Sequence, residues 1–254
     1  MGKFKDSFSF IHMKKIFLLI LLSFTAFAQQ TTNKPERVNW FQDLGFGMFI
    51  HWNVDVSLGS VISHSLAGAS DEYVNKYIQE LPSYFNPEQF NPKNWAKLAK
   101  LAGMKYVVFT AKHHAGFAMF QTKTTPFNVM NTPFKRDITK EIVEAFRAEG
   151  IAVGIYFSPD DFYYLHTHKQ PIGRAQDPAH YPKTNPGLME YDKAQLKELL
   201  TQYGKIDILF IDGPGDGLRE YAWSINPDLV ITRDAMKTPE QTTPNASLPR
   251  DRKS

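Results

Sequence analysis

Short, uninterrupted hydrophobic runs alternate along the chain with longer stretches in which apolar residues recur at helical spacing. The runs begin near residues 45, 105, 151, 206 and 229. A continuous apolar run of this kind is typical of a strand covered on both faces, as in a parallel sheet. Helical spacing is found between the runs, over 92–103, 137–149, 188–203 and 218–225. The alternation predicts parallel βαβ units.

Helix boundaries are also marked in the sequence. Asn91 and Asp137 precede two of the predicted helices as N-caps, and Gly103 and Gly150 follow them as stops. By contrast, residues 53–91 are rich in Ser, Asn and Tyr and predict an irregular loop. A loop this long inside a compact domain is usually functional.

Every predicted strand ends in polar side chains, whereas the strand starts carry no comparable set. This polarity is typical of a (β/α)8 barrel, which keeps its active site at the carboxyl ends of its strands. We therefore predict an α/β fold, a TIM-like barrel of which this chain holds about five of eight βα units. A doubly wound sheet is the alternative, but the chain lacks a glycine-rich dinucleotide or phosphate loop. The strand-end residues are His51, His113, His114, Tyr156, Asp212 and Arg233.

The amino-acid composition excludes several classes of protein and of site. The chain has 254 residues, 43% of them hydrophobic, which allows one sizeable core and excludes a disordered protein. It contains no cysteine, which excludes disulfides, zinc–thiolate sites, thiol catalysis and a lipid-modified N-terminal cysteine.

The N-terminal segment predicts a secretory signal peptide over residues 1–28. A short basic start at Met13–Lys15 precedes a mostly apolar run, and Ala26–Ala28 matches a small-x-small cleavage site. The run is too short for a membrane span, and residues 1–12 read as a mis-assigned start. We expect a secreted or periplasmic protein cut after Ala28.

Three further segments complete the expected organisation: a linker over 29–40, a catalytic barrel domain over 41–244 and a disordered tail over 245–254. Removing residues 1–28 takes away four lysines and one aspartate and leaves 25 basic and 25 acidic residues. A neutral body gives no electrostatic reason to expect nucleic acid or a membrane as partner.

Asp212 follows the apolar run 208–211 and precedes Gly213. It has two readings. It could cap the next helix, since Asp is a common N-cap residue, or it could be a catalytic carboxylate at the carboxyl end of a strand.

The histidines at the strand ends are candidates for ligand binding. Neighbouring residues of a strand point to opposite sides, so His113 and His114 are poorly placed to share one metal ion. Hydrogen bonding to a polyhydroxylated ligand is the preferred reading, and a buried His bonded to backbone is the structural alternative. His51 beside Trp52 also suits sugar binding, as does an aromatic content of 14%. We expect no metal and no cofactor.

A second carboxylate, Glu240, lies beyond the fifth predicted strand. Glycoside hydrolysis needs two carboxyl groups across the scissile bond. Glu240 could pair with Asp212 in that role, or it could be an exposed loop residue.

Six short motifs of this chain together resemble the catalytic barrel of the retaining α-L-fucosidases of glycoside hydrolase family 29. The similarity runs from Phe46 to about Gln241. The motifs that carry it are Gly47–Trp52, Phe90–Pro92 with Trp95, Lys105–Phe117, Lys135–Asp137, Gly154–Ser158 and Phe210–Gly213.

The resemblance implies a role for each matching residue. Asp212 would be the nucleophile, and Glu240 would be the acid/base that some members carry in a Thr-x-Glu motif. Arg233 corresponds to an arginine that lies near the nucleophile in some members. Phe210, together with Phe49, is a candidate for the apolar wall beside the sugar methyl group. The residues implied to hold fucose are His51, Glu72, Tyr73, His113, His114 and Tyr156.

The resemblance also shows departures. Ala115 stands where the family usually has Asp, and Phe210 stands where it commonly has Trp. The family's last barrel strands and its C-terminal β-sandwich have no counterpart here. The implied activity is retaining hydrolysis of terminal α-L-fucosyl residues from glycans or glycoconjugates. The competing expectation is a catalytically impaired protein that still binds fucose.

Overall fold

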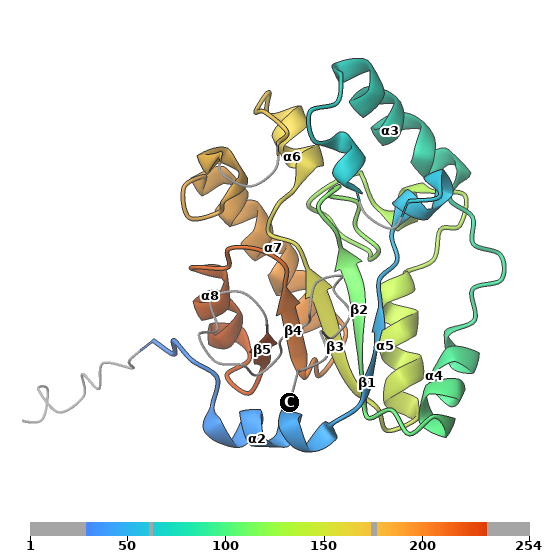
Figure 1. Cartoon of the computed structure of the whole chain (residues 1–254), viewed down its shortest axis with the longest axis vertical. Coiled ribbons are helices and arrows are strands. Elements are labelled where there is room, and N and C mark those ends of the chain that lie inside the picture. The colour runs from blue at the N-terminus through green and yellow to red at the C-terminus, as the bar shows by residue number, and fades with distance from the viewer. Residues whose placement is uncertain (1–28, 61–62, 174–176, 233–254) are drawn as a thin grey trace, which may run out of the picture.

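The structure, a computed structural model, describes residues 29–60, 63–173 and 177–232. In that part of the chain five strands form one parallel sheet in the order β1-β2-β3-β4-β5 (Figure 1). The predicted α/β class and the positions of all five strands are confirmed. The strands are β1 (Gly47–Ile50), β2 (Tyr106–Lys112), β3 (Ala152–Phe157), β4 (Ile208–Ile211) and β5 (Val230–Thr232).

Four helices follow the predicted pattern between the strands. Figure 1 shows α4 and α5 beside β1 and β2, and α7 and α8 on the other side of the molecule. The side chains of Asn91, Asp137 and Asn185 accept hydrogen bonds from backbone N–H groups of the first turns, as N-caps do. The helices are α4 (Pro92–Leu101), α5 (Ile138–Ala148), α7 (Pro186–Gln202) and α8 (Leu218–Ile225).

Two segments expected to be irregular contain helices. The predicted loop 53–91 holds η1 (Val54–Leu58), η2 (Ser63–Leu66) and the 14-residue α3 (Asp71–Tyr84). Ser70 caps α3, and Val74, Tyr77 and Leu81 bury one face of it. Single polar and aromatic residues between these apolar positions hid the helical spacing. The remaining short helices are η3 (Val129–Asn131), α6 (Phe162–Thr167) and η4 (Pro178–His180).

The expected linker over 29–40 was also wrong in part, because α2 (Pro35–Leu44) begins inside it. Figure 1 shows α2 across the end of the sheet where the strands start. Its Phe41 packs against Tyr106, with ring centroids 5.2 Å apart. Pro35 at the first helical position and Gly45 at the end mark this helix in the sequence.

The two faces of the sheet carry separate cores. Alternate residues on one face pack against the helices, as Val107, Phe109 and Ile155 do. On the other face Val108, Tyr156, Ile208, Phe210 and Val230 form a smaller cluster with Phe41 of α2. This inner cluster is closed by α2 at the strand starts.

At the opposite end, the carboxyl ends of the strands point toward α3 and α6 (Figure 1). The described helices include none that is both long and apolar enough to cross a membrane.

Candidate active site

The inner face of the sheet brings the strand-end residues together. Tyr156 and Phe210 are register partners on β3 and β4. Asp212 lies two residues after Phe210 and therefore points to the same side. His51 stands in the same relation to Phe49 on β1, and its ring centroid lies 5.7 Å from that of Tyr156.

Asp212 is held by Tyr156. The Tyr156 hydroxyl donates a short hydrogen bond to Oδ2 of Asp212. The Asp212 backbone N–H donates to the carbonyl of Phe157 at 3.0 Å, which continues the β3–β4 ladder by one residue. Its side chain is 16% exposed. A carboxylate that is fixed by a donor and still reachable is suited to attack an electrophilic carbon.

An aromatic wall stands below this carboxylate. The Phe210 ring stacks on Tyr156 with centroids 5.5 Å apart, and Phe49 meets Phe210 edge-on at 5.1 Å. Phe210 is buried, whereas Phe49 is 39% exposed. The predicted apolar wall is therefore one contiguous surface, of which Phe49 supplies the accessible part.

His113 is buried next to other imidazole rings. Its Nδ1 lies 2.9 Å from the hydroxyl of Ser63, and its ring stacks on Tyr156 at 5.7 Å. Burial, followed by the neighbouring rings of His114, His51 and His64, lowers the pKa of His113 well below its usual value. A neutral imidazole offers one donor and one acceptor, which suits a ligand hydroxyl.

His114 lies between two carboxyl groups. Its Nε2 is 3.6 Å from Oδ2 of Asp212, and its Nδ1 is 3.8 Å from Oδ2 of Asp160. The Ser158 hydroxyl makes a short hydrogen bond with the same Nδ1. The His64 ring stacks on His114 with centroids 5.7 Å apart.

Asp160 differs from an ordinary surface carboxylate. Burial, followed by the charge of Asp212, raises its pKa to about 7, and Lys112 only partly opposes this. Its Oδ1 is buried and makes no hydrogen bond within the described residues. Asp160 therefore takes up a proton at a higher pH than an exposed aspartate does.

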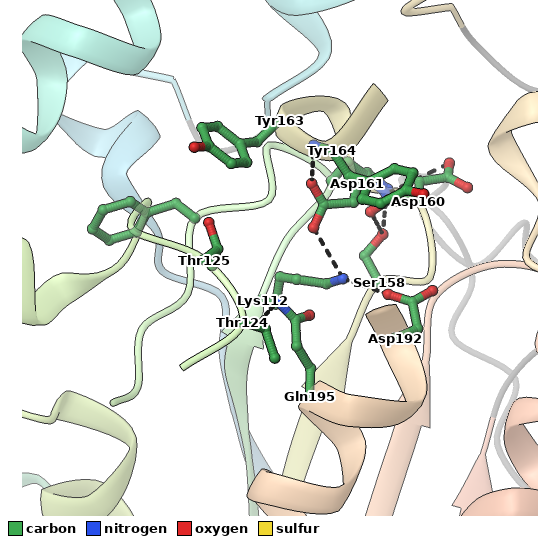
Figure 2. Close-up of polar contacts among 12 residues, drawn as sticks. Lys112, Thr124, Thr125, Ser158, Asp160, Asp161, Tyr163, Tyr164, Asp192 and Gln195 are labelled. Carbon is green, nitrogen blue, oxygen red and sulfur yellow. Dashed lines mark hydrogen bonds and ion pairs between the residues drawn. The ribbon is translucent and has the colours of Figure 1, made fainter. Parts of the chain in front are cut away.

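Below the loop that carries Asp160 lies a fully buried ion cluster (Figure 2). The Lys112 ammonium donates to Asp161 at 3.2 Å and to Asp192 at 2.8 Å, and all three side chains are 0% exposed. Burial opposes the charge on Lys112, but the two carboxylates outweigh it and raise its pKa. Burial also raises the pKa of Asp192, to about 8, against the influence of Lys112.

Gly116 makes room for this cluster. It has φ +85°, and an added Cβ would lie 2.2 Å from Oδ1 of Asp161. The same Asp161 oxygen accepts a hydrogen bond from the backbone N–H of Tyr164 at 2.7 Å, capping α6. The loop after β3 is thus fixed at Asp161, next to Asp160.

One group in the described part of the chain could hold a metal ion. His113, His114 and Asp212 each offer a ligand atom, and these atoms lie within 4.8 Å of one another. The expectation that the two histidines point apart was wrong, because β2 ends at Lys112 and their ring centroids are 4.4 Å apart. Each of the three side chains already bonds a hydroxyl of the protein, of Ser63, Ser158 or Tyr156. We therefore keep the hydroxyl-binding interpretation.

Two further predicted sugar contacts, Glu72 and Tyr73, lie on α3. The Glu72 side chain is 80% exposed and pairs with Lys76 at 3.2 Å. Tyr73 is 39% exposed and lines a separate pocket of about 400 Å³ with Tyr77 and Tyr84. Arg233 and Glu240 lie outside the described residues.

The sequence analysis missed three residues that contact the predicted histidines from behind. Ser63 and His64 lie on the four-residue helix η2 and Asp160 lies in the loop after β3, and neither segment is long enough to show a sequence period. The one available signal was Asp160–Asp161 directly after the third strand, because polar groups there join the other strand ends.

Comparison with known proteins identifies the family. Residues 23–250 match the family described as alpha-L-fucosidase. Alpha-L-fucosidase 1 of Arabidopsis thaliana is 31% identical over 168 residues, which cover 61% of this chain and 30% of that protein. The solved structure of alpha-L-fucosidase isoenzyme 1 from Paenibacillus thiaminolyticus matches with a TM-score of 0.64 at 35% sequence identity. The match covers 77% of this chain and 49% of the Paenibacillus chain.

A third similar protein is a family 29 α-L-fucosidase from Bacteroides thetaiotaomicron, solved as a trapped covalent intermediate with 2-fluoro-fucosyl fluoride. Its TM-score is 0.63 at 28% identity, over 80% of this chain and 50% of that one. This chain thus spans half or less of each of these three proteins. The chain belongs to the α-L-fucosidases of glycoside hydrolase family 29.

Proposed function

We propose that this protein hydrolyses terminal α-L-fucosyl residues of glycans or glycoconjugates with retention of configuration. The observation that carries the proposal is the position of Asp212. It directly follows β4 and accepts a hydrogen bond from Tyr156, and its carboxylate lies within 4.8 Å of ring nitrogens of His113 and His114. The His51 ring meets that of His113 edge-on. The covalent intermediate named for the Bacteroides thetaiotaomicron relative supports the same chemistry here.

In the first step, one Asp212 carboxylate oxygen attacks the anomeric carbon of the fucosyl unit, and the bond from that carbon to the leaving oxygen breaks. Glu240 gives its proton to the leaving oxygen. In the second step, Glu240 takes a proton from water, which attacks the anomeric carbon and releases Asp212. Retention requires carboxyl groups about 5–5.5 Å apart, which is our expectation for Asp212 and Glu240.

The proposed substrate follows from the two phenylalanine rings and the histidine rings at the strand ends. His51, His113 and His114 would bond the sugar hydroxyls, and Phe49 with Phe210 would pack against the C5 methyl group. Arg233 would lie near the nucleophile, and Glu72 with Tyr73 would contact the sugar.

The proposal extends to the fold and to the cellular location of the protein. We propose that the five strands belong to a (β/α)8 barrel, as in the family. The basic start, apolar run and small-x-small site within residues 1–28 support export and cleavage after Ala28.

The test is release of fucose from an aryl α-L-fucoside by wild type, Asp212→Ala and a control variant, Asp43→Ala on the outside of α2. We expect wild type and the control to be active and Asp212→Ala to lose at least about three orders of magnitude, as removal of a nucleophile does. Proton NMR of the first product should show the α anomer. Equal rates in wild type and Asp212→Ala, or the β anomer, would contradict the proposal.

Glu240→Gln tests the second carboxyl. An aryl leaving group of low pKa needs little protonation, whereas a sugar leaving group needs the acid. We expect the variant to lose far more activity on a fucosyl disaccharide than on the aryl fucoside. Equal losses on the two substrates would remove Glu240 from the acid role.

A further inference from the structure

A pocket of about 400 Å³ lies between η1 and α3, and the proposed mechanism does not use it. We call it the α3 pocket. We propose that the α3 pocket is a second carbohydrate-binding site, which holds a neutral pyranose unit of the glycan that carries the fucosyl residue. The choice of this glycan as ligand rests on the proposed function, whereas the binding of a sugar ring does not.

Three tyrosines of α3 line the pocket. Tyr77 follows Tyr73 by four residues and Tyr84 follows Tyr77 by seven, and these helical spacings place the three rings on one side of α3. Tyr84 is 71% exposed and Tyr73 is 39% exposed. A tyrosine ring packs its apolar face against the C–H groups of a sugar and offers a hydroxyl at its edge. Two accessible tyrosines beside a hollow therefore provide the kind of surface that binds a pyranose ring.

Exposed apolar side chains are concentrated on the two elements that form the pocket. Among the described residues eight large hydrophobic side chains are exposed, and half of these lie on η1 or α3. Single exposed apolar residues are common and need no explanation, but a group of them beside a pocket marks a binding surface. The four on these elements are Val56, Leu58, Tyr73 and Tyr84.

The polar groups of the pocket favour an uncharged ligand. Lys76 and Glu80, which lie one turn apart on α3, bring one positive and one negative charge, and Ser57 of η1 adds a hydroxyl. A phosphate or a carboxylated sugar would gain from Lys76 and lose to Glu80. Sugar hydroxyls both donate and accept, so they can use the ammonium as a donor and the carboxylate as an acceptor.

The floor of the pocket is fixed by a buried contact. The Tyr77 hydroxyl donates a short hydrogen bond to Oδ1 of Asp55 on η1, and the two residues are 3% and 1% exposed. This bond ties α3 to η1. The side chains of Ser70 and Asn53 cap the two helices at their first turns. A pocket held in this way loses little conformational entropy when a ligand binds.

The α3 pocket and the strand-end residues lie at the same end of the sheet. Figure 1 shows that the carboxyl ends of the strands point toward α3. The η1 helix begins three residues after His51, and Ser63 of η2, between η1 and α3, lies 2.9 Å from Nδ1 of His113. The pocket shares no lining residue with the strand-end group. This arrangement is the one that a single glycan bound at two points requires.

Saturation-transfer difference NMR tests sugar binding without hydrolysis. The probes are three neutral disaccharides without fucose: lactose, N-acetyllactosamine and cellobiose. We expect wild type to bind at least one of them, and an excess of methyl α-L-fucoside should not displace it. Tyr84→Ala should weaken the binding about three- to tenfold, as expected for the loss of one stacked ring.

The matched control is Leu98→Ala on α4. Leu98 is 63% exposed and lies outside the pocket, so its replacement should leave the binding unchanged. Circular dichroism checks the fold of both variants, and Glu80→Ala replaces Tyr84→Ala if the latter does not fold. Absence of binding in wild type, displacement by methyl α-L-fucoside, or equal binding by wild type and the pocket variant overturns the proposal.

Kinetics on two substrates test the link to the proposed function. Tyr84→Ala should raise KM for a fucosylated pentasaccharide about three- to tenfold with kcat unchanged, which is the sign of lost uniform binding. The same variant should hydrolyse an aryl α-L-fucoside as wild type does, because that substrate has no second sugar. Equal changes on the two substrates would overturn the role assigned to the α3 pocket.

Two further outcomes separate this proposal from others. A change in the oligomeric state of Tyr84→Ala in sedimentation velocity would identify the tyrosines as an interface between copies of the chain and would overturn the proposal. A wild type that binds a disaccharide through Tyr84 but is inactive on the aryl α-L-fucoside would refute the proposed function and support sugar binding by the pocket.

Discussion

The hydroxyl of Tyr156 donates a hydrogen bond to Oδ2 of Asp212, although the two residues are 56 positions apart in the chain. The bond exists because β3 and β4 are parallel neighbours that place Tyr156 opposite Phe210, two residues before Asp212. It fixes the Oδ2 oxygen of the carboxylate. The hydrogen bond from the Tyr156 hydroxyl also stabilises the negative charge of the Asp212 carboxylate.

Replacing Tyr156 with Phe should lower kcat/KM on an aryl α-L-fucoside by about 10- to 100-fold, since a hydrogen bond to a charged group contributes roughly 1.5–3 kcal/mol. The ring stays, so its stacking on Phe210 and His113 stays, and the thermal midpoint should change little. Steady-state kinetics and calorimetry on the same preparations check both parts. A large drop in stability would show that the hydroxyl serves the fold instead.

Replacing Lys112 with Met should destabilise the protein by roughly 3–5 kcal/mol, because the buried carboxyl groups of Asp161 and Asp192 lose the ammonium that donates to both of them. Both Asp161 and Asp192 are fully buried and bond the ammonium directly. Urea unfolding at neutral pH measures the loss. The matched control is Lys140→Met, an exposed lysine whose partner Glu144 lies 4.0 Å away, and it should cost less than about 1 kcal/mol.

Replacing Gly116 with Ala should cost more stability than replacing Gly150 with Ala. Both glycines have positive φ, +85° and +73°, so each variant pays roughly 1–2 kcal/mol for a left-handed alanine. Only at Gly116 does the new Cβ meet a neighbour, Oδ1 of Asp161 at 2.2 Å, whereas nothing lies within 4 Å at Gly150. We expect an additional loss of about 1–3 kcal/mol from overpacking. Equal thermal midpoints would contradict the fixed position of Asp161.

The free energy of unfolding should depend on pH through Asp192. Burial raises its pKa from 3.8 to about 8, so the folded state binds a proton that the unfolded state releases. This contribution is complete below pH 4 and is lost as the pH rises toward 8, at up to about 1.4 kcal/mol per pH unit. Asp192→Asn keeps the acceptor for Lys112 and removes the titration. Urea unfolding between pH 5 and 8 should therefore show a less negative slope in the variant, and parallel curves would refute the protonated Asp192.

The sequence predicted the strands well because a buried parallel strand has a strong local signal. The apolar runs ending at His51 and Asp212 both proved to be strands of one sheet. The convergence of His51, Tyr156 and Asp212 also followed, since residues two apart on a strand share a face. These are consequences of strand geometry and need no tertiary information.

The parts that could not be predicted depend on loops and turns. The chain turns after Lys112, so His113 and His114 approach one another against the expectation for a strand. The position of Asp160 behind His114 depends on the anchoring of Asp161, and no local pattern reports such a long-range ion pair. The α3 helix was missed because it buries only one narrow stripe, Val74, Tyr77 and Leu81.

The parallel order of the five strands has a consequence for how the protein could be followed during folding. His51 follows the first strand and Asp212 follows the fourth, so no short segment of the chain contains both residues. Strand pairings between residues so distant in sequence form slowly during folding. A small molecule that binds both His51 and Asp212 would therefore recognise only chains in which the sheet is complete. Fluorescence of such a probe would count correctly assembled molecules in a refolding mixture, where ordinary spectroscopic signals count secondary structure alone.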